Sequence, residues 1–213
     1  FLTKLFIPFV NFFVESGFRN PYEFFYQIGV TKAFPYSATM LYALAIPRMV
    51  LGYFIPVGYQ LTSIWHLFVA RVPVLMADIG ILLILLSWLR TKEDLVIKYY
   101  WSSPILFYIN YYHGQLDAIP IAFLIAAIAL IFKKRYIFGY ILLGLAVSAK
   151  ANVLASVPFL AIYLFMVTQS WFAVLNMSSV VLLAYLIFNF PFLLSNGFRQ
   201  MVIFAGEQAR VFN

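Results

Sequence analysis

The chain has 213 residues, of which 65% are hydrophobic and only 10% are charged. This composition, with a mean hydropathy of +0.95, excludes an ordinary soluble domain and indicates an integral membrane protein, because soluble domains are about half apolar and a quarter charged. The net charge of +7 is dispersed among apolar segments, which excludes nucleic acid and favours anionic lipid head groups as partners. The absence of cysteine excludes disulfides and thiolate metal sites.

The first 67 residues predict an outer-face region rather than full membrane spans. Residues 1–14 are apolar but too short to cross a bilayer, so we expect a helix lying in the membrane surface. A second helical run over 37–59 contains Pro47 and Pro56, which we expect to interrupt it. This run therefore predicts a broken or re-entrant segment.

The middle of the chain, residues 68–194, predicts a bundle of membrane-spanning helices. A span needs about 20 mostly apolar residues. Six segments fit best: 68–89, 95–112, 116–132, 136–150, 152–168 and 171–194. The remaining residues, 195–213, form an amphipathic outer-face segment. The predicted fold is an all-α integral membrane protein, a polytopic helix bundle with about six clear spans plus interfacial or re-entrant outer helices.

Two short basic connections predict the orientation of this bundle. They are Arg90-Thr91-Lys92-Glu93-Asp94 and Lys133-Lys134-Arg135. Cytoplasmic loops are enriched in Lys and Arg, so both connections are expected to be cytoplasmic. Counting spans from them places the turn at 113–117, the turn at Lys150 and both terminal regions on the opposite, outer face.

Basic residues outnumber acidic ones on this predicted outer face, which favours an anionic ligand such as a lipid phosphate. Arginine can bind two phosphate oxygens at once, and lysine supplies a compact positive charge. Arg48, Lys150 and Arg199 are the candidates for contact with the phosphate. Each could instead be a side chain that only extends to the head groups, and Lys150 could neutralise the end of a helix.

A short polar run, Tyr112-His113-Gly114-Gln115-Leu116-Asp117, separates two of the predicted spans. Polar groups at such positions are costly and are candidates for function. If the run is helical, His113 and Asp117 lie on one face. They could bind a divalent ion, act as acid and base, hydrogen-bond a sugar hydroxyl, or form a structural pair. Gln115 adds both a donor and an acceptor for hydroxyl groups.

One further acidic residue, Asp78, lies inside the first predicted span. An acidic group there needs a partner, and Arg71 is two helical turns away on the same face. A structural ion pair is favoured, and a proton relay is the alternative.

Four sequence elements follow one another in the chain. They are Gly17-Phe18-Arg19-Asn20-Pro21-Tyr22 with Phe34-Pro35-Tyr36, Arg71-Val72-Pro73-Val74-Leu75-Met76-Ala77-Asp78, Gly114-Gln115-Leu116-Asp117, and Gly144-Leu145-Ala146 leading to Lys150. Taken in this order, they resemble those of the GT-C membrane glycosyltransferases that use polyprenyl-phosphate sugars. The sequence is most similar to bacterial and archaeal mannosyltransferase-like proteins and to the catalytic subunit of the first GPI mannosyltransferase.

The resemblance implies an inverting sugar transfer from a lipid-phosphate donor to a glycan, lipid or protein acceptor on the extracytoplasmic side. It also implies an outer-loop carboxylate that serves as base or as ligand of a divalent cation such as Mg²⁺ or Mn²⁺. The family's Asp at that position is missing before Asp78. We expect it to precede Phe1, with Glu15 or Glu23 as the fallback base, and we name no metal-ligating residue.

The sequence thus predicts a glycosyltransferase, with His113, Gln115 and Asp117 contacting the sugar or the acceptor. The expected location is a bacterial inner (cytoplasmic) membrane with the active face outward. Two alternatives stay open: a non-catalytic GT-C-fold subunit of a complex with partner membrane subunits, and a lipid or sugar transporter. A transporter would be favoured by inverted repeats and broken helices, but only 37–59 is a candidate for the latter.

Overall fold

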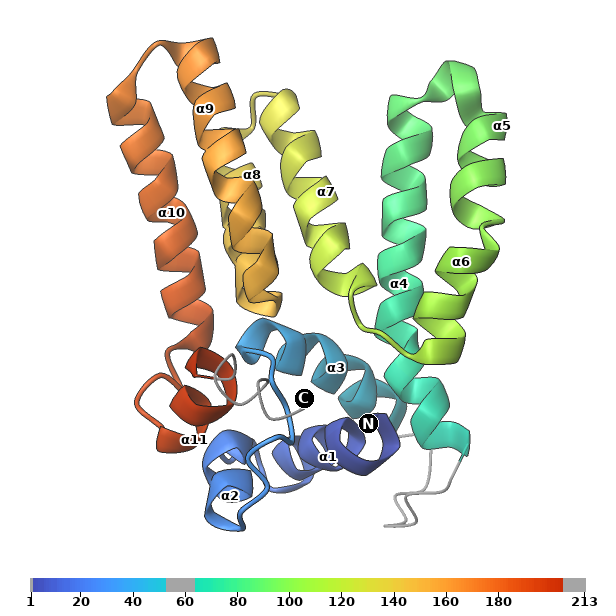
Figure 1. Cartoon of the computed structure of the whole chain (residues 1–213), viewed down its shortest axis with the longest axis vertical. Helices are drawn as coiled ribbons and strands as arrows, with labels where there is room; N and C mark the ends of the chain where they lie inside the picture. Colours follow the sequence, from blue (N-terminus) through green and yellow to red (C-terminus); the bar gives the residue numbers. More distant parts are fainter. Residues whose placement is uncertain (1, 53–63, 205–213) are drawn as a thin grey trace, which may run out of the picture. The chain divides into compact units, whose positions relative to one another are not determined.

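The computed structural model describes residues 2–52 and 64–204. Every regular element in these ranges is a helix, which confirms the predicted all-α fold (Figure 1). The chain divides into two compact units. The first unit contains Phe1–Pro73 together with Asn189–Asn213, and the second contains Val74–Phe188.

The first unit joins the two terminal regions of the chain through short helices. A π-helical turn, Leu2–Phe6, leads into α1 (Ile7–Glu15). It is followed by α2 (Pro21–Gln27), α3 (Ala38–Gly52) and the start of α4 (Ile64–Trp88). The C-terminal part adds α11 (Asn196–Phe198) and a π-helical turn, Arg199–Ile203. The helix predicted over 1–14 is therefore present from Leu2 onward, whereas its location in a membrane surface stays a prediction.

Local sequence explains where α1 ends and α2 begins. Gly17 and Phe18 both have positive φ angles, 74° and 65°, which an α-helix cannot continue through. Asn20 then caps α2, because its side-chain oxygen accepts a hydrogen bond from the Glu23 backbone N–H at 3.2 Å. Pro21 occupies the first helical position, where its missing N–H costs nothing.

Aromatic rings form the core of the first unit. The rings of Phe9 and Phe34 stack with centroids 4.7 Å apart, and Tyr22 meets Phe198 edge to face at 5.0 Å. All four side chains are fully buried. Because Phe198 comes from the C-terminal region and the others from the N-terminal region, these contacts join the two ends of the chain in one core.

The predicted interruption of the 37–59 run at Pro47 is wrong. Helix α3 continues through Pro47 to Gly52. A proline inside a helix removes one backbone hydrogen bond, but tertiary packing supplies most helical stability in proteins. Here Pro47 is buried, and α3 packs against α1. Pro56 lies outside the described residues.

The second unit is a series of helices that run back and forth. It begins with α4 from Val74 onward and continues through five short helical pieces: a 3₁₀ turn (Arg90–Lys92), α5 (Glu93–Val96), a π-helical turn (Ile97–Trp101), α6 (Pro104–Phe107) and a second π-helical turn (Tyr108–His113). Four further helices follow: α7 (Ala118–Phe132), α8 (Tyr136–Ala149), α9 (Val157–Thr168) after a 3₁₀ turn (Ala151–Ser156), and α10 (Trp171–Asn189).

Three helical stretches among the described residues are long and apolar enough to cross a membrane: His66–Trp88, Ala151–Thr168 and Trp171–Asn189. Helices α7 and α8 are apolar but shorter. The span predicted at 95–112 is interrupted at Ser102-Ser103, because Pro104 starts a new helix and the Ser103 hydroxyl accepts a hydrogen bond from the Leu106 N–H at 3.4 Å.

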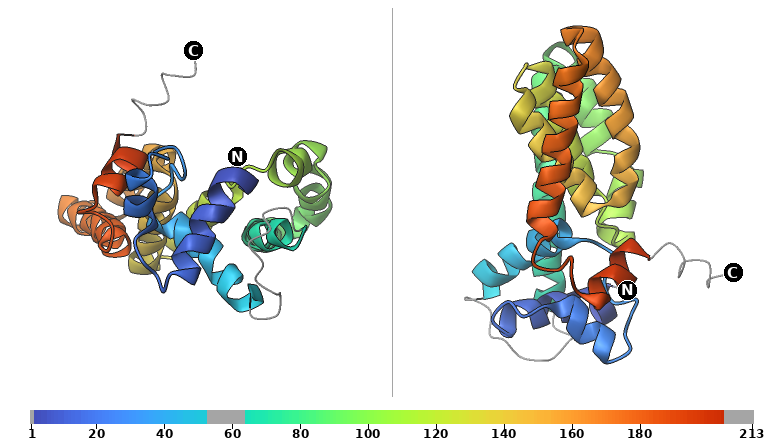
Figure 2. Two further views of the ribbon diagram at one scale, coloured as in Figure 1. Left: turned by 90° about the horizontal axis from the view of Figure 1, so that it is seen from below. Right: turned by 90° about the vertical axis from the view of Figure 1, so that its left-hand side faces the viewer.

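Helices α7 to α10 share one buried core. Its members are Ala127, Ile131, Tyr140, Leu143, Leu160, Leu164, Val174 and Val181. The buried Tyr140 hydroxyl donates a hydrogen bond to the backbone oxygen of Leu160 at 3.0 Å, which ties α8 to α9. Figures 1 and 2 show α7 and α8 side by side and antiparallel, in agreement with their dense packing.

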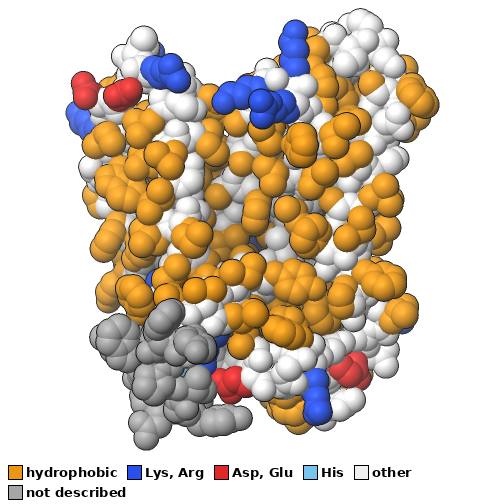
Figure 3. All heavy atoms as spheres, turned by 180° about the vertical axis from the view of Figure 1, so that it is seen from behind, with side chains coloured by type: hydrophobic (Ala, Val, Ile, Leu, Met, Phe, Trp, Pro, Cys, Tyr) orange, Lys and Arg blue, Asp and Glu red, His pale blue; other side chains and the backbone are white. Residues whose placement is uncertain are grey.

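This up-and-down course sorts the connections of the second unit to two ends. The connections Arg90–Lys92 and Lys133–Arg135 lie at one end, and the turns at 113–117 and at Lys150 lie at the other (Figure 1). Figure 3 shows Lys and Arg side chains gathered at the first end, with hydrophobic side chains covering the flanks below it. This sorting agrees with the predicted orientation, and the assignment of each end to a membrane face stays a prediction.

Candidate functional site

An ion pair at the end of the second unit opposite the basic connections joins two residues that the sequence nominated separately. Lys150 Nζ lies 2.6 Å from Asp117 Oδ1. The two side chains are 30% and 32% exposed, so the pair is accessible without being fully solvated. The contact places a candidate for the sugar or acceptor, Asp117, beside a candidate for the phosphate, Lys150, and both roles stay predictions.

The packing of α7 against α8 brings these two residues together. Asp117 immediately precedes α7, and Lys150 immediately follows α8. Because the two helices are antiparallel neighbours, the start of one lies beside the end of the other. A Cβ on Gly139 would lie 2.6 Å from Ile131 Cγ1 and 3.0 Å from the Ala127 oxygen, so this glycine permits the close approach. Each charge also suits its helix end, negative at the start of α7 and positive at the end of α8.

A cavity of about 510 Å³ opens beside the ion pair. Asp117 and Lys150 form its charged part, and its other polar lining residues are Asn152 and Ser156. The rest of the wall is mostly apolar and comes from α7, the 3₁₀ turn and α9: Pro120, Ile121, Leu124, Val153, Ala155 and Phe159. We call this cavity the Asp117–Lys150 groove. A charged part beside an apolar wall suits a ligand with a polar head and a hydrocarbon chain.

His113 and Gln115 are both exposed and lie next to Asp117 in the chain. Gly114 has φ 88° and ends the preceding π-helical turn, so residues 114–116 are not helical. The helical premise for a His113–Asp117 pair on one face is therefore wrong, and Asp117 pairs with Lys150. The His113 ring instead lies 6.3 Å from the Tyr108 ring.

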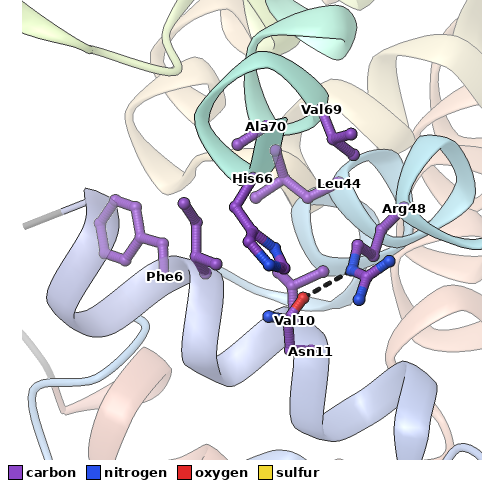
Figure 4. A pocket seen from close by; sticks show the side chains of 9 residues that line it. Phe6, Val10, Asn11, Leu44, Arg48, His66, Val69 and Ala70 are labelled. Carbon is purple, nitrogen blue, oxygen red and sulfur yellow. Dashed lines mark hydrogen bonds between the residues drawn. The ribbon is translucent and has the colours of Figure 1, made fainter. Parts of the chain in front are cut away.

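Arg48, a predicted phosphate contact, lies in the first unit and is already engaged. Its Nε donates to Asn11 Oδ1 at 2.7 Å, and its terminal nitrogen lies 3.1 Å from Glu15 Oε1. The Arg48 side chain is only 7% exposed. The neighbouring cavity measures about 20 Å³, the space of a single water molecule, and His66 points into it from α4 (Figure 4). The partner of Arg48 in its ion pair, Glu15, is one of the two fallback bases.

The other fallback base, Glu23, joins α2 to α11. Its two carboxylate oxygens accept hydrogen bonds from the Gly197 backbone N–H at 3.2 Å and from Gln27 Nε2 at 3.3 Å. Arg199, the third predicted phosphate contact, is exposed, and its Nε donates to the Leu193 oxygen at 3.4 Å. The roles proposed for Glu15, Glu23, Arg48 and Arg199 stay predictions.

The structure also shows a buried polar cluster that the sequence reasoning did not assemble. The Asp78 carboxylate accepts hydrogen bonds from the hydroxyls of Tyr100 and Tyr111 at 3.0 and 2.7 Å and from Asn110 Nδ2 at 3.0 Å. A cavity of about 380 Å³ adjoins it. The polar Asn110 within an apolar stretch was the signal that could have identified the cluster. The pairing with Arg71 stays a prediction, since Arg71 belongs to the other unit.

Within residues 2–52 and 64–204, no group of three or more His, Cys, Asp or Glu side chains is arranged to hold a metal ion. The divalent cation that the resemblance allows stays a prediction.

Comparison with known families finds one similarity that bears on this site. Residues 115–213, a little under half of the chain, match the family model described as "ALG3 protein". No curated protein and no solved structure matches. The match supports a polytopic GT-C glycosyltransferase. It includes the whole Asp117–Lys150 groove and excludes the clusters around Arg48 and Asp78.

Proposed function

We propose that this protein transfers a sugar from a polyprenyl-phosphate donor to an acceptor on the extracytoplasmic face of a membrane. The observation that carries the proposal is the Asp117–Lys150 ion pair beside a largely apolar cavity, inside the segment similar to a glycosyltransferase family. That family uses dolichyl-phosphate mannose, so mannose is the sugar we propose. The proposed location is a bacterial cytoplasmic membrane, and the endoplasmic reticulum is the location of the matched family.

In this proposal the lysine of the ion pair contacts the donor phosphate. When the bond between the sugar and the phosphate breaks, negative charge grows on the departing phosphate oxygen. A positive charge already positioned beside that oxygen stabilises the transition state more than the ground state. The apolar wall of the groove accommodates the first part of the lipid chain. Asp117 is then available to accept a hydrogen bond from a sugar hydroxyl.

The acceptor hydroxyl must lose a proton during an inverting transfer, and the proposal leaves this step to a carboxylate outside the groove. Glu15 and Glu23 are the candidates within the given sequence. Both already have hydrogen-bonding partners in the first unit. No part of this mechanism depends on a metal ion, and the effect of a chelator on transfer tests that point directly.

The test is a transfer assay with the natural full-length protein in proteoliposomes. Polyprenyl-phosphate mannose with a labelled sugar is supplied together with a lipid extract of the native membrane as the acceptor source. We expect Lys150→Ala to lower the transfer rate by roughly 10²-fold or more, the scale of losing one preorganised electrostatic contact to a departing anion. Lys150→Arg should retain part of the activity, because it keeps the charge but changes its geometry.

Lys134→Ala provides the matched control, because Lys134 is exposed at the opposite end of the same unit. It should transfer at the wild-type rate. Equal rates for Lys150→Ala and wild type would refute the proposed site. If the labelled sugar crosses the bilayer while it is still attached to its lipid carrier, the protein is a transporter. If the purified protein leaves the donor lipid intact, and the donor is consumed only after partner subunits are added, the protein is a non-catalytic component of a complex.

A further inference from the structure

The ion pair raises a question that the proposed function does not answer. Lys150 is the proposed phosphate contact, yet its ammonium group already binds the Asp117 carboxylate at 2.6 Å. The pair is neutral as a whole. A lipid phosphate that binds Lys150 therefore competes with Asp117 for the ammonium hydrogens and brings a second negative charge next to the carboxylate.

We propose that Asp117 makes the groove selective for phosphate lipids that carry a sugar over phosphate lipids that do not. The inference rests on the proposed function and concerns the same groove. A sugar offers hydroxyl donors to the carboxylate at the moment when the phosphate takes Lys150. Lys150 thus exchanges Asp117 for the phosphate, and Asp117 exchanges Lys150 for the sugar of the same ligand.

A lipid with a bare phosphate cannot complete this exchange. It supplies an anion for Lys150 but no hydroxyl donors for Asp117, so the carboxylate gains no hydrogen bond from the ligand and lies beside both an apolar wall and a second negative charge. Removing one partner of a partly buried charge leaves its desolvation uncompensated. The nearby anion adds like-charge repulsion. Sites built to hydrogen-bond a hydroxyl discriminate strongly against ligands that lack it.

The geometry of the groove allows one ligand to reach both groups. Asp117 and Lys150 line the same cavity, which at about 510 Å³ lies within the usual range of about 300 to 1,000 Å³ for small-molecule pockets. The apolar side chains of Ile121, Leu124 and Phe159 line the cavity next to the pair and offer a surface for the lipid chain. Asn152 supplies a further amide for hydroxyl groups.

Such selectivity has a use in a membrane. Anionic phospholipids are far more abundant there than any sugar carrier, and the reaction itself leaves the carrier with a bare phosphate. If Lys150 were unpaired, both kinds of lipid would compete for it. Asp117 opposes those that offer no hydroxyl donors, such as phosphatidic acid and the spent carrier, and it would also favour departure of the spent carrier after transfer.

The experiment measures binding rather than transfer, in nanodiscs that contain the full-length protein. Affinities are determined for polyprenyl-phosphate mannose, for polyprenyl phosphate and for phosphatidic acid. Wild type should prefer the sugar-bearing lipid by about tenfold, the effect of one charge-assisted hydrogen bond. Asp117→Asn should bind the bare phosphate lipids about tenfold more tightly than wild type and thereby lose the preference. Lys150→Gln should weaken all three ligands alike.

Asp94→Asn is the matched control, because it makes the same chemical change at an exposed position at the other end of the unit. It should keep the wild-type preference. Donor lipids with deoxymannose head groups give a second test that needs no mutation, since loss of the contacted hydroxyl should reduce binding to that of bare polyprenyl phosphate. An unchanged preference in Asp117→Asn, or deoxy donors that all bind like the parent, would overturn the inference. Transfer could still depend on Lys150 in that case, so the two proposals fail separately.

Discussion

Gly144 offers a stringent test of how α8 packs against α10. A Cβ added at this position would lie 2.7 Å from Ala184 Cβ and 2.8 Å from the backbone oxygen of Val181. Carbon atoms in contact normally lie about 3.5 to 4.0 Å apart, so the two helices would have to separate locally by roughly 1 Å. Small residues permit such close helix contacts in membranes. Overpacking of this kind costs about 1–3 kcal/mol.

Gly80→Ala is the control for the intrinsic effect of the substitution. Gly80 lies in α4 with nothing within 4 Å of an added Cβ, so it gains up to about 1 kcal/mol from the better helix propensity of alanine. Gly144→Ala has the same gain and the packing cost as well. We therefore expect Gly144→Ala to be about 1–3 kcal/mol less stable than Gly80→Ala, or roughly 2–10 °C in the midpoint of thermal unfolding in detergent. Equal midpoints for the two variants would refute the packing of α8 on α10.

Three further predictions use the same preparations. Glu15→Gln leaves the buried Arg48 without its charged partner, so it should lower stability by about 1–3 kcal/mol in thermal unfolding, whereas loss of transfer at unchanged stability would identify Glu15 as the base instead. Tyr111→Phe removes one donor to a buried carboxylate and should cost about 1–2 kcal/mol; a neutral result would contradict that hydrogen bond. Because the chain lacks cysteine, Gln115→Cys and Lys134→Cys can be labelled individually with an impermeant maleimide in sealed vesicles, and labelling of both from one side would refute the predicted orientation.

Much of the fold follows from local sequence. The apolar segments after residue 63 become helices because an apolar stretch of this length satisfies its backbone hydrogen bonds internally. Their limits coincide with residues that have a local reason to stop or start a helix, such as Gly114 with its positive φ and Pro104 with its capping serine. The helical course of α3 through Pro47 was not predictable in this way, since burial against other helices outweighs the local cost.

The candidate site likewise combines features that local sequence predicts with a contact that depends on helix packing. Asp117 and Lys150 attract attention in the sequence because each is a charge next to an apolar segment. Nothing in the local sequence relates one to the other, because they lie 33 positions apart in the chain. The local pattern instead suggested His113 as a partner for Asp117, and that pairing depended on a helix which Gly114 ends.

Local sequence accounts for an all-α membrane protein with basic connections and polar turns at alternate helix ends, because hydrophobicity and turn chemistry act over a few residues. Which charges meet depends instead on how the helices pack. Lys150 reaches Asp117 because α8 packs antiparallel beside α7, and Arg48 reaches Glu15 because α3 packs on α1. Ion pairs of this kind depend on helix packing, and packing is a property of the whole chain.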